Sequence, residues 1–279
     1  MPQITLLDGP MGTELSARGV STETALWSAA AIDSAPQVIA AIHRDYAEAG
    51  ATVHTANTFR TKRRQIPDRW EELARRAVAI ARASVPAWHR IAGSIAPLED
   101  CYRPDLSPDE CREEHRELAE ALAAAGVDLL LCETFPHVGE ALVAVEEAAR
   151  TGLPTWVALT AGPEGTLLSP EAMAHGAREA VRRGATAVLV NCTRATETER
   201  FVAALASLGG LGGLGAVPFG AYANAGSAED GIGWGAGEAG AQAYAAIAER
   251  WAALGATILG GCCGTGPAHL RALAHRWAR

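Results

Sequence analysis

Short apolar segments alternate with longer amphipathic segments along nearly all of this 279-residue chain. A short apolar run bounded by turn residues is typical of a buried strand, whereas apolar residues spaced three or four apart indicate a helix. The segments expected to form strands are Ile4–Leu7, Thr52–Thr55, Ile91–Ile95, Leu129–Leu131, Thr155–Leu159, Ala187–Val190, Phe219–Tyr222 and Thr257–Leu259. The segments expected to form helices are Ala35–Ala49, Trp70–Ser84, Pro108–Ala125, Val138–Thr151, Pro170–Arg183, Glu197–Leu208, Gln242–Leu254 and Pro267–Trp277. Eight strand–helix units in series predict an α/β fold, a (β/α)8 TIM barrel that forms a single domain over residues 1–279.

Glycine follows most of the predicted helices directly. The residue just past a helix often adopts a left-handed conformation, which favours glycine. The glycines in this position are Gly50, Gly126, Gly152, Gly184 and Gly255. A further glycine-rich segment, residues 209–215, is interpreted as a flexible connector on the barrel face opposite the site.

The composition restricts the class of partner. The net charge is −8, with acidic and basic residues interspersed, which argues against a nucleic-acid groove or an anionic membrane as the main partner. The amino terminus has neither a basic flank nor a long apolar core, and no apolar run approaches the roughly 18 residues of a membrane span. We therefore expect a cytoplasmic protein that binds small molecules, and six cysteines that are reduced thiols.

Polar residues follow the predicted strands at the point where each strand ends. In a barrel of parallel strands the carboxyl ends meet at one face, where the chemistry of such folds takes place. The residues at these ends are Asp8, Asn57, Ser94, Glu133, Thr160, Asn191, Cys192, Tyr222, Asn224, Cys262 and Cys263. A single polar site is therefore expected at this face.

Two adjacent cysteines, Cys262 and Cys263, lie within the glycine cluster Gly260–Gly266. Neighbouring side chains of an extended strand point to opposite faces, so both thiols can reach one point only at a bend, which glycine permits. Cys192 follows the sixth predicted strand and would lie at the same mouth. Three thiolates suit zinc, and an open fourth position is typical of catalytic zinc. The alternatives are a vicinal disulfide, or buried thiols that pack as small hydrophobic groups.

Eight short motifs, in order from residue 6 to about residue 270, resemble the homocysteine S-methyltransferase family. They are Leu7-Asp8-Gly9-Pro10-Met11-Gly12-Thr13-Glu14-Leu15, Ala56-Asn57-Thr58-Phe59, Gly93-Ser94, Glu133-Thr134, Gly165-Thr166-Leu167-Leu168-Ser169, Val190-Asn191-Cys192, Tyr222-Ala223-Asn224-Ala225-Gly226 and Gly260-Gly261-Cys262-Cys263-Gly264. The cysteine pair alone would be a weak signal. Eight ordered matches over nearly the whole chain are a strong one.

The resemblance implies a (β/α)8 barrel that holds Zn²⁺ through Cys192, Cys262 and Cys263, which would also be the catalytic residues. It further implies that Asp8 and Glu133 receive the amino-acid part of homocysteine. Carboxylates suit that role because they accept charge-assisted hydrogen bonds from an ammonium group.

Four other residues at strand ends are expected to help bind substrate, namely Asn57, Asn191, Tyr222 and Asn224. For each of these four residues the alternative role is to hold a loop in place. Backbone amides of the glycine-rich turn after the first strand are expected to receive the substrate carboxylate.

The expected reaction transfers a methyl group from a sulfonium donor, S-methylmethionine or S-adenosylmethionine, to the thiol of L-homocysteine and forms methionine. Zinc coordination would remove the thiol proton and make the sulfur nucleophilic. Relatives that use cobalamin and folate carry additional modules, and the betaine-using relatives are longer, which favours a sulfonium donor. The loop of residues 226–240 is expected to cover the donor, with Trp234 stacking on its positive charge.

Other functions and the oligomeric state stay open. The acceptor could be another thiol or a selenol, or the barrel could bind zinc or a thiol without catalysis. An aldolase-type barrel would need a Schiff-base lysine, and the only lysine is Lys62, in a charged loop. The chain could be a monomer or a homo-oligomer.

The remaining reactive side chains are expected to have ordinary structural roles. Cys101, Cys111 and Cys132 lack the company of the other cysteines, and His54 and His137 are expected to make local hydrogen bonds. The basic run of residues 60–64 is expected to be a solvated loop, although its arginine at position 60 is unusual for the family and leaves the acceptor in doubt.

Overall fold

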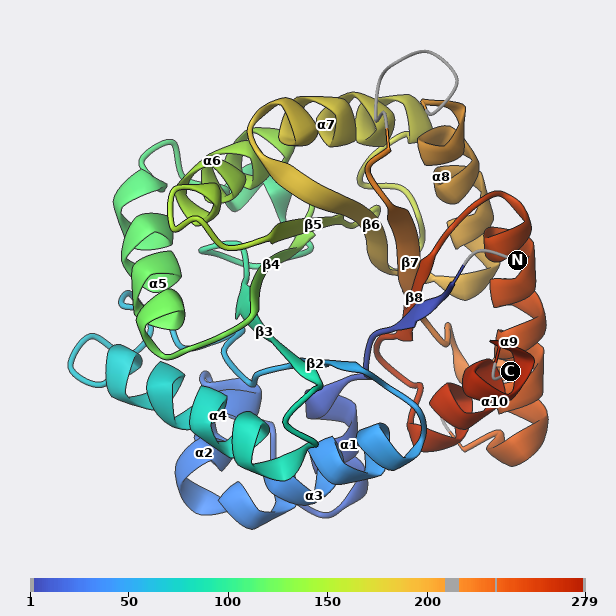
Figure 1. Ribbon diagram of the computed structural model, residues 1–279, viewed down its shortest axis with the longest axis horizontal. Helices are drawn as coiled ribbons and strands as arrows, with labels where there is room; N and C mark the ends of the chain where they lie inside the picture. Colours follow the sequence, from blue (N-terminus) through green and yellow to red (C-terminus); the bar gives the residue numbers. More distant parts are fainter. Residues whose placement is uncertain (1–2, 209–215, 234, 278–279) are drawn as a thin grey trace.

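The computed structural model describes residues 3–208, 216–233 and 235–277, which form an eight-stranded parallel barrel surrounded by helices (Figure 1). Neighbouring strands pair in the order β1-β8-β7-β6-β5-β4-β3-β2. The strands are β1 (Thr5–Leu6), β2 (Val53–Thr55), β3 (Arg90–Ile95), β4 (Leu129–Phe135), β5 (Thr155–Leu159), β6 (Ala185–Arg194), β7 (Phe219–Asn224) and β8 (Ile258–Gly261). A parallel bridge between Leu7 and Val53 joins β1 to β2 and closes the ring. The predicted TIM barrel is confirmed.

Helices follow the strands and cover the outside of the barrel (Figure 1). The α-helices are α1 (Met11–Ala17), α2 (Ala31–Ser34), α3 (Pro36–Glu48), α4 (Trp70–Ser84), α5 (Arg112–Ala124), α6 (Val138–Ala149), α7 (Pro170–Arg182), α8 (Ala195–Ser207), α9 (Gly237–Ala253) and α10 (Pro267–Trp277). Short 3-10 helices are η1 (Trp27–Ala30), η2 (Pro104–Leu106) and η4 (Ala228–Asp230). All five glycines expected after helices have positive φ angles, between 80° at Gly152 and 108° at Gly184.

Two groups of buried side chains make up the core. The larger lies between the strands and the helices, and the smaller fills the inside of the barrel. Cys192, Tyr222 and Cys262 belong to the inner group, together with aliphatic residues such as Leu131 and Leu189. The inward-facing side chains of the strands therefore pack together inside the barrel, directly below the polar residues at the carboxyl ends of the strands.

Several boundaries differ from the sequence-based expectation. Strands β4, β6, β7 and β8 all continue past their expected ends, so Glu133, Asn191, Cys192 and Asn224 lie within strands rather than after them, and Tyr222 is not the last residue of its strand. Several of the added residues are polar, among them Glu133 and Thr134 of β4 and Thr193 and Arg194 of β6, which is why an apolar pattern did not include them. Helix α5 begins four residues later than expected, and α1, η1 and α2 were not predicted. The glycine-rich segment 209–215 and the stacking residue expected at position 234 lie outside the described residues.

Within the described ranges, no helix is both long and apolar enough to cross a lipid bilayer.

The packed interior predicts a large effect on stability when Trp156, the second residue of β5, is replaced. The side chain of Trp156 is 5% exposed, and the centre of its ring lies 5.2 Å from the guanidinium carbon of Arg90. Trp156→Ala should lower the free energy of unfolding by about 3–5 kcal/mol because it leaves a cavity inside the barrel. The measurement is urea unfolding followed by circular dichroism. Trp88→Ala is the control, since that ring is 73% exposed and its loss should cost less than about 1 kcal/mol. Equal costs for the two variants would contradict a tightly packed interior.

Candidate functional site: a buried thiol cluster beside two carboxylates

A cavity of about 490 Å³ opens at the carboxyl ends of the strands. Most of the residues predicted for the site line it, namely Asp8, Asn57, Glu133, Cys192, Tyr222, Cys262 and Cys263. Ser94 lines it as well. The buried Asn191 and Asn224 are not part of its wall, although both contact Cys192. The closure of the barrel thus brings together residues that are up to 255 positions apart, from Asp8 to Cys263.

The three cysteines form one cluster of free thiols in the wall of this cavity. Hydrogen bonds with Cys192 and then with Cys262 hold the pKa of Cys263 well below its ordinary value. Hydrogen bonds with Cys192 and with Cys263, together with burial, raise the pKa of Cys262 well above its ordinary value. Cys263 is therefore the thiol of the three that loses its proton most readily. The vicinal disulfide considered from the sequence is not formed.

The backbone around Cys192 is strained. Cys192 has a φ angle of 48°, and Thr134 on strand β4 has one of 63°, both in the left-handed region that side-chain-bearing residues rarely occupy. Each lies at a register irregularity near the end of its strand. The Thr134 hydroxyl lies 3.6 Å from the Cys192 sulfur, so the two irregularities meet at the thiol cluster. Strain of this kind persists where the surrounding structure enforces it, and it is frequent at functional sites.

Two asparagine side chains support this conformation. Asn191 donates to the Thr134 hydroxyl at 2.7 Å and to the Cys192 sulfur at 3.6 Å, and Asn224 donates to the Cys192 carbonyl at 3.0 Å. The side-chain oxygens of both asparagines are buried, and neither has a hydrogen-bond partner in the part of the chain that the structure describes. The observed contacts of these asparagines are therefore with the cysteine loop, which is the alternative role considered from the sequence.

Asp8 lies in the cavity wall directly after the bridge that closes the barrel. Its carboxylate accepts hydrogen bonds from the Thr55 backbone amide at 2.9 Å and from the Thr55 hydroxyl at 3.0 Å. Its backbone carbonyl accepts from the amide of Gly261, the residue before the cysteine pair, at 3.2 Å. Burial raises the pKa of Asp8 well above its ordinary value, the bonds from Thr55 lower it, and the charge of Glu133 raises it again.

Glu133 lies on β4 and is held on both oxygens. One oxygen accepts from the Ser94 hydroxyl, and the other accepts from the Tyr222 hydroxyl at 2.9 Å. Burial raises the pKa of Glu133, although both hydrogen bonds lower it. Two carboxyl groups thus share a buried cavity with no basic side chain paired to either among the described residues. Such a pair favours a ligand that brings positive charge.

Asn57 has both ends of its amide engaged. Its nitrogen donates to the Ser28 carbonyl at 2.8 Å, and its oxygen accepts from the Ser28 hydroxyl at 2.7 Å. The asparagine therefore holds the 3-10 helix η1, and with it Trp27, against the cavity. Any contribution of Asn57 to substrate binding would therefore come from holding η1 and Trp27 in this position.

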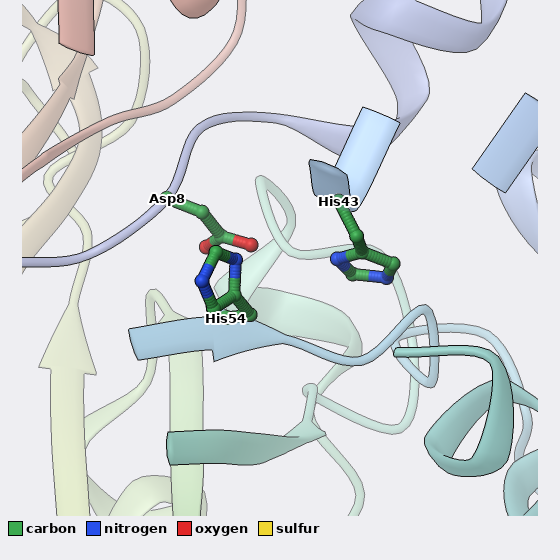
Figure 2. A group of neighbouring side chains, drawn as sticks. All are labelled: Asp8, His43 and His54. Carbon is green, nitrogen blue, oxygen red and sulfur yellow. The ribbon is translucent and has the colours of Figure 1, made fainter. Parts of the chain in front are cut away.

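A second group of possible metal ligands consists of Asp8, His43 and His54. Figure 2 shows the Asp8 carboxylate beside the His54 ring of β2, with the His43 ring of α3 facing them; their ligand atoms lie within 4.8 Å of one another. Burial lowers the pKa of His43 to about 4 and that of His54 to about 3, so both rings are neutral. His54 is hydrogen-bonded to His89 at 2.9 Å, which confirms the local bond expected for it. His43 has no partner on either nitrogen among the described residues.

The basic run of residues 60–64 is not the solvated loop expected from its charge. Lys62 is 2% exposed, and its ammonium group donates to the carbonyls of Pro97 and Leu98. Burial lowers its pKa to about 7. Arg64 is paired with Glu99 and Glu114. A charge pattern cannot reveal that neighbouring loops offer carbonyl and carboxylate partners, so the prediction for this run was wrong. Lys62 lies outside the cavity wall, which argues against an aldolase mechanism.

The cavity wall also contains residues that were not predicted as site residues, among them Trp27, Phe59, Cys101 and Tyr102. Cys101 is a free thiol whose pKa is raised to about 12 by burial. Phe59 belongs to a motif quoted from the sequence, and its aromatic character was the available signal. Trp27 and Tyr102 lie in irregular segments that carry no periodic pattern. Cys111 and Cys132 lie outside the wall, as expected for structural thiols.

Comparisons with known proteins agree with this geometry. The family model described as homocysteine S-methyltransferase matches residues 5–277. The chain belongs to the homocysteine S-methyltransferase family. It is therefore a methyltransferase-family enzyme, and the family acts on small molecules.

Individual relatives give the same family with different acceptors in their names. Homocysteine S-methyltransferase of Escherichia coli is 33% identical, over 98% of this chain and 95% of its own length. Selenocysteine methyltransferase of Astragalus bisulcatus is 28% identical, over 96% of this chain and 90% of its own length. The crystal structure of the metallated E. coli homocysteine methyltransferase MmuM matches with a TM-score of 0.80 and 27% identity, covering 98% of this chain and 96% of that one.

The raised pKa of Glu133 predicts a pH-dependent stability difference. Its contribution to folding is fully present at low pH and is lost as the pH rises from the unfolded value, near 4.5, through the raised folded value. Glu133→Gln removes this titration, so the metal-free variant should gain stability relative to the metal-free parent between pH 5 and pH 8. The expected gain is about 1.4 kcal/mol for each tenfold increase in proton affinity that folding gives this carboxyl group.

Urea unfolding of both proteins at pH 5 and at pH 8 measures this gain. The exposed Glu120→Gln is the control and should show a difference that does not change with pH. A constant difference for Glu133→Gln would contradict the raised pKa.

Proposed function

We propose that this chain transfers a methyl group from a sulfonium donor to the thiol of L-homocysteine and forms methionine, with Zn²⁺ as its metal. The observation that supports this most directly is that the thiols of Cys192, Cys262 and Cys263 and the carboxyl groups of Asp8 and Glu133 line the wall of one cavity. The thiols suit a soft metal, and the carboxyl groups suit the ammonium group of an amino acid.

The thiol cluster fits zinc in its chemistry. Cys192, Cys262 and Cys263 would be the ligands, because three neighbouring buried thiols can all lose their protons only when a cation compensates the charge. Bound there, Zn²⁺ would lower the pKa of a substrate thiol and leave it nucleophilic at neutral pH. The nitrogen and oxygen set of Asp8, His43 and His54 is less suited, since both carboxylate oxygens of Asp8 are already hydrogen-bonded.

The residues of the chain orient the acceptor. Asp8 and Glu133 would accept hydrogen bonds from its ammonium group, which would return both carboxyl groups to their charged form. Tyr222 and Ser94 hold Glu133 in place by donating to it, and Thr55 does the same for Asp8. Two anchored carboxylates at one wall fix the direction in which the thiol of the amino acid points.

The chemical step needs no further proton transfer once the thiol is deprotonated. A bond forms between the acceptor sulfur and the methyl carbon, and the bond from that carbon to the donor sulfur breaks. The electron pair of the broken bond stays on the donor sulfur, which leaves as a neutral thioether. Holding the two sulfur atoms in line accounts for most of what the chain must contribute.

Two alternatives differ in what they predict. The relative named selenocysteine methyltransferase supports a selenol acceptor, since a selenol would meet the same thiols and carboxylates. A barrel that binds zinc or a thiol without catalysis would keep its metal after Glu133→Gln and would show no turnover in either form.

The metal site can be tested with Co²⁺ in place of zinc, because cobalt–thiolate bonds absorb strongly in the near ultraviolet. One equivalent should produce this absorption, and Cys263→Ala should weaken binding by more than the roughly 10- to 100-fold cost of an outer-shell change. Cys111→Ala, outside the cavity wall, is the control and should bind cobalt like the parent. Binding without thiolate absorption, lost on His54→Gln but kept on Cys263→Ala, would instead place the metal at the Asp8 and histidine group.

The reaction can be tested by mass spectrometry with every pairing of two donors and three acceptors. The donors are S-methylmethionine and S-adenosylmethionine, and the acceptors are homocysteine, selenocysteine and cysteine. The zinc-loaded protein should form methionine from homocysteine, and Cys263→Ala should abolish the product. Methylation of selenocysteine or cysteine alone would move the activity to another acceptor. No product from any pair would favour the non-catalytic alternative.

A further inference from the structure

Arg60 is the one basic side chain in the described wall of the cavity. The acidic residues there are Asp8, Glu133 and Asp100. An amino-acid substrate or a sulfonium amino acid carries a carboxylate, and Arg60 is the only side chain of this wall that can pair with one. The guanidinium therefore has a direct bearing on which ligands the cavity accepts.

The guanidinium of Arg60 is fixed on one side and unsatisfied on the other. Gln65, with its amide turned to suit both groups, accepts from a terminal nitrogen of Arg60 at 3.0 Å and donates to its carbonyl at 3.1 Å. The guanidinium carbon lies 5.7 Å from the centre of the Phe59 ring. The Nε atom is buried and has no hydrogen-bond partner among the described residues. An oriented donor of this kind suits a carboxylate.

Asp100 supplies an opposite charge in the same wall. Its carboxylate accepts from the Tyr102 backbone amide at 2.8 Å, which fixes a turn in the loop between β3 and η2. Neither Arg60 nor Asp100 takes part in an ion pair within the described ranges, so they are not within 4.0 Å of one another. Two opposite charges that line one cavity without meeting leave room for a zwitterion between them.

Aromatic rings accompany these charges. Trp27 and Phe59 meet edge to face with centroids 5.9 Å apart, and both line the cavity together with Tyr102. Aromatic faces attract cations such as a sulfonium. This part of the cavity thus offers a partner for each charge of a sulfonium amino acid.

Resting on the proposed methyl transfer, we propose that Arg60 and Asp100 bind the amino-acid end of the methyl donor, Arg60 its carboxylate and Asp100 its ammonium group. The acceptor already has Asp8 and Glu133, which lie at the ends of their strands. Arg60 lies five residues beyond the end of β2, farther along the loop. The donor class is then a sulfonium that carries both a free carboxylate and a free ammonium group, as S-methylmethionine does.

Calorimetric titration of the zinc-loaded protein without acceptor tests this assignment, since no turnover can then occur. Three sulfonium probes separate the charges: S-methylmethionine carries both groups, dimethylsulfoniopropionate only the carboxylate, and trimethylsulfonium neither. Arg60→Gln should weaken the two carboxylate-bearing probes about tenfold or more and leave trimethylsulfonium unchanged. Asp100→Asn should weaken S-methylmethionine alone. Arg103→Gln is the matched control, because Arg103 lies in the same loop as Asp100 but is paired with Asp105. This variant should change the affinity for none of the three probes.

Two results would overturn the assignment. One is a parent protein that binds all three probes equally, and the other is an Arg60→Gln variant that loses all three equally or raises the KM of homocysteine instead of the donor. Failure of the proposed function looks different. In that case S-methylmethionine would bind with the predicted dependence on both residues, yet no methylated acceptor would form.

Discussion

Electrostatic interaction among the three thiols Cys192, Cys262 and Cys263 is the constraint on which the site depends. Hydrogen bonds among the three thiols lower the pKa of Cys263, and hydrogen bonds, burial and the charge of Cys263 raise the pKa of Cys262 and of Cys192. Ionisation of all three side by side is therefore unfavourable. The barrel supplies the rigid frame that keeps them together against this cost. Two belong to the packed interior of the barrel, so they cannot separate without disturbing the core. The fold therefore holds the three cysteines in place, although it does not compensate the negative charge that three thiolates would carry.

The same frame explains why the strand ends are irregular. A regular ladder would turn Thr134 and Cys192 away from a common point, since side chains alternate along a strand. Left-handed residues at the ends of β4 and β6 redirect both toward the cavity. Asn191 and Asn224 then hold this geometry through hydrogen bonds to the neighbouring hydroxyl and carbonyl groups. The strained residues and the hydrogen bonds that support them thus lie together beside the Cys192 side chain.

The sequence was informative wherever a local pattern determined the structure. Alternating apolar and amphipathic segments determine the barrel, and the position of Asp8, Glu133 and the cysteines at strand ends follows from its topology. Burial of Lys62 and the cavity-facing position of Tyr102 could not be inferred, because both depend on how irregular loops pack against one another. The extra residues of β6 were missed for a related reason, since strand pairing continued through polar residues without an apolar pattern. What the sequence withheld is therefore tertiary context.

Asp8 has a position in the barrel as well as in the cavity. Its backbone carbonyl accepts from Gly261 of β8, while its carboxylate accepts from the amide of Thr55, so the side chain takes a place in the ladder that a backbone carbonyl would otherwise hold. The seam between the first and last strands on one side and β2 on the other is closed partly by a side chain that also lines the cavity. Occupancy of the cavity and integrity of the seam are consequently coupled. Solvent exchange at the Thr55 amide would report on both.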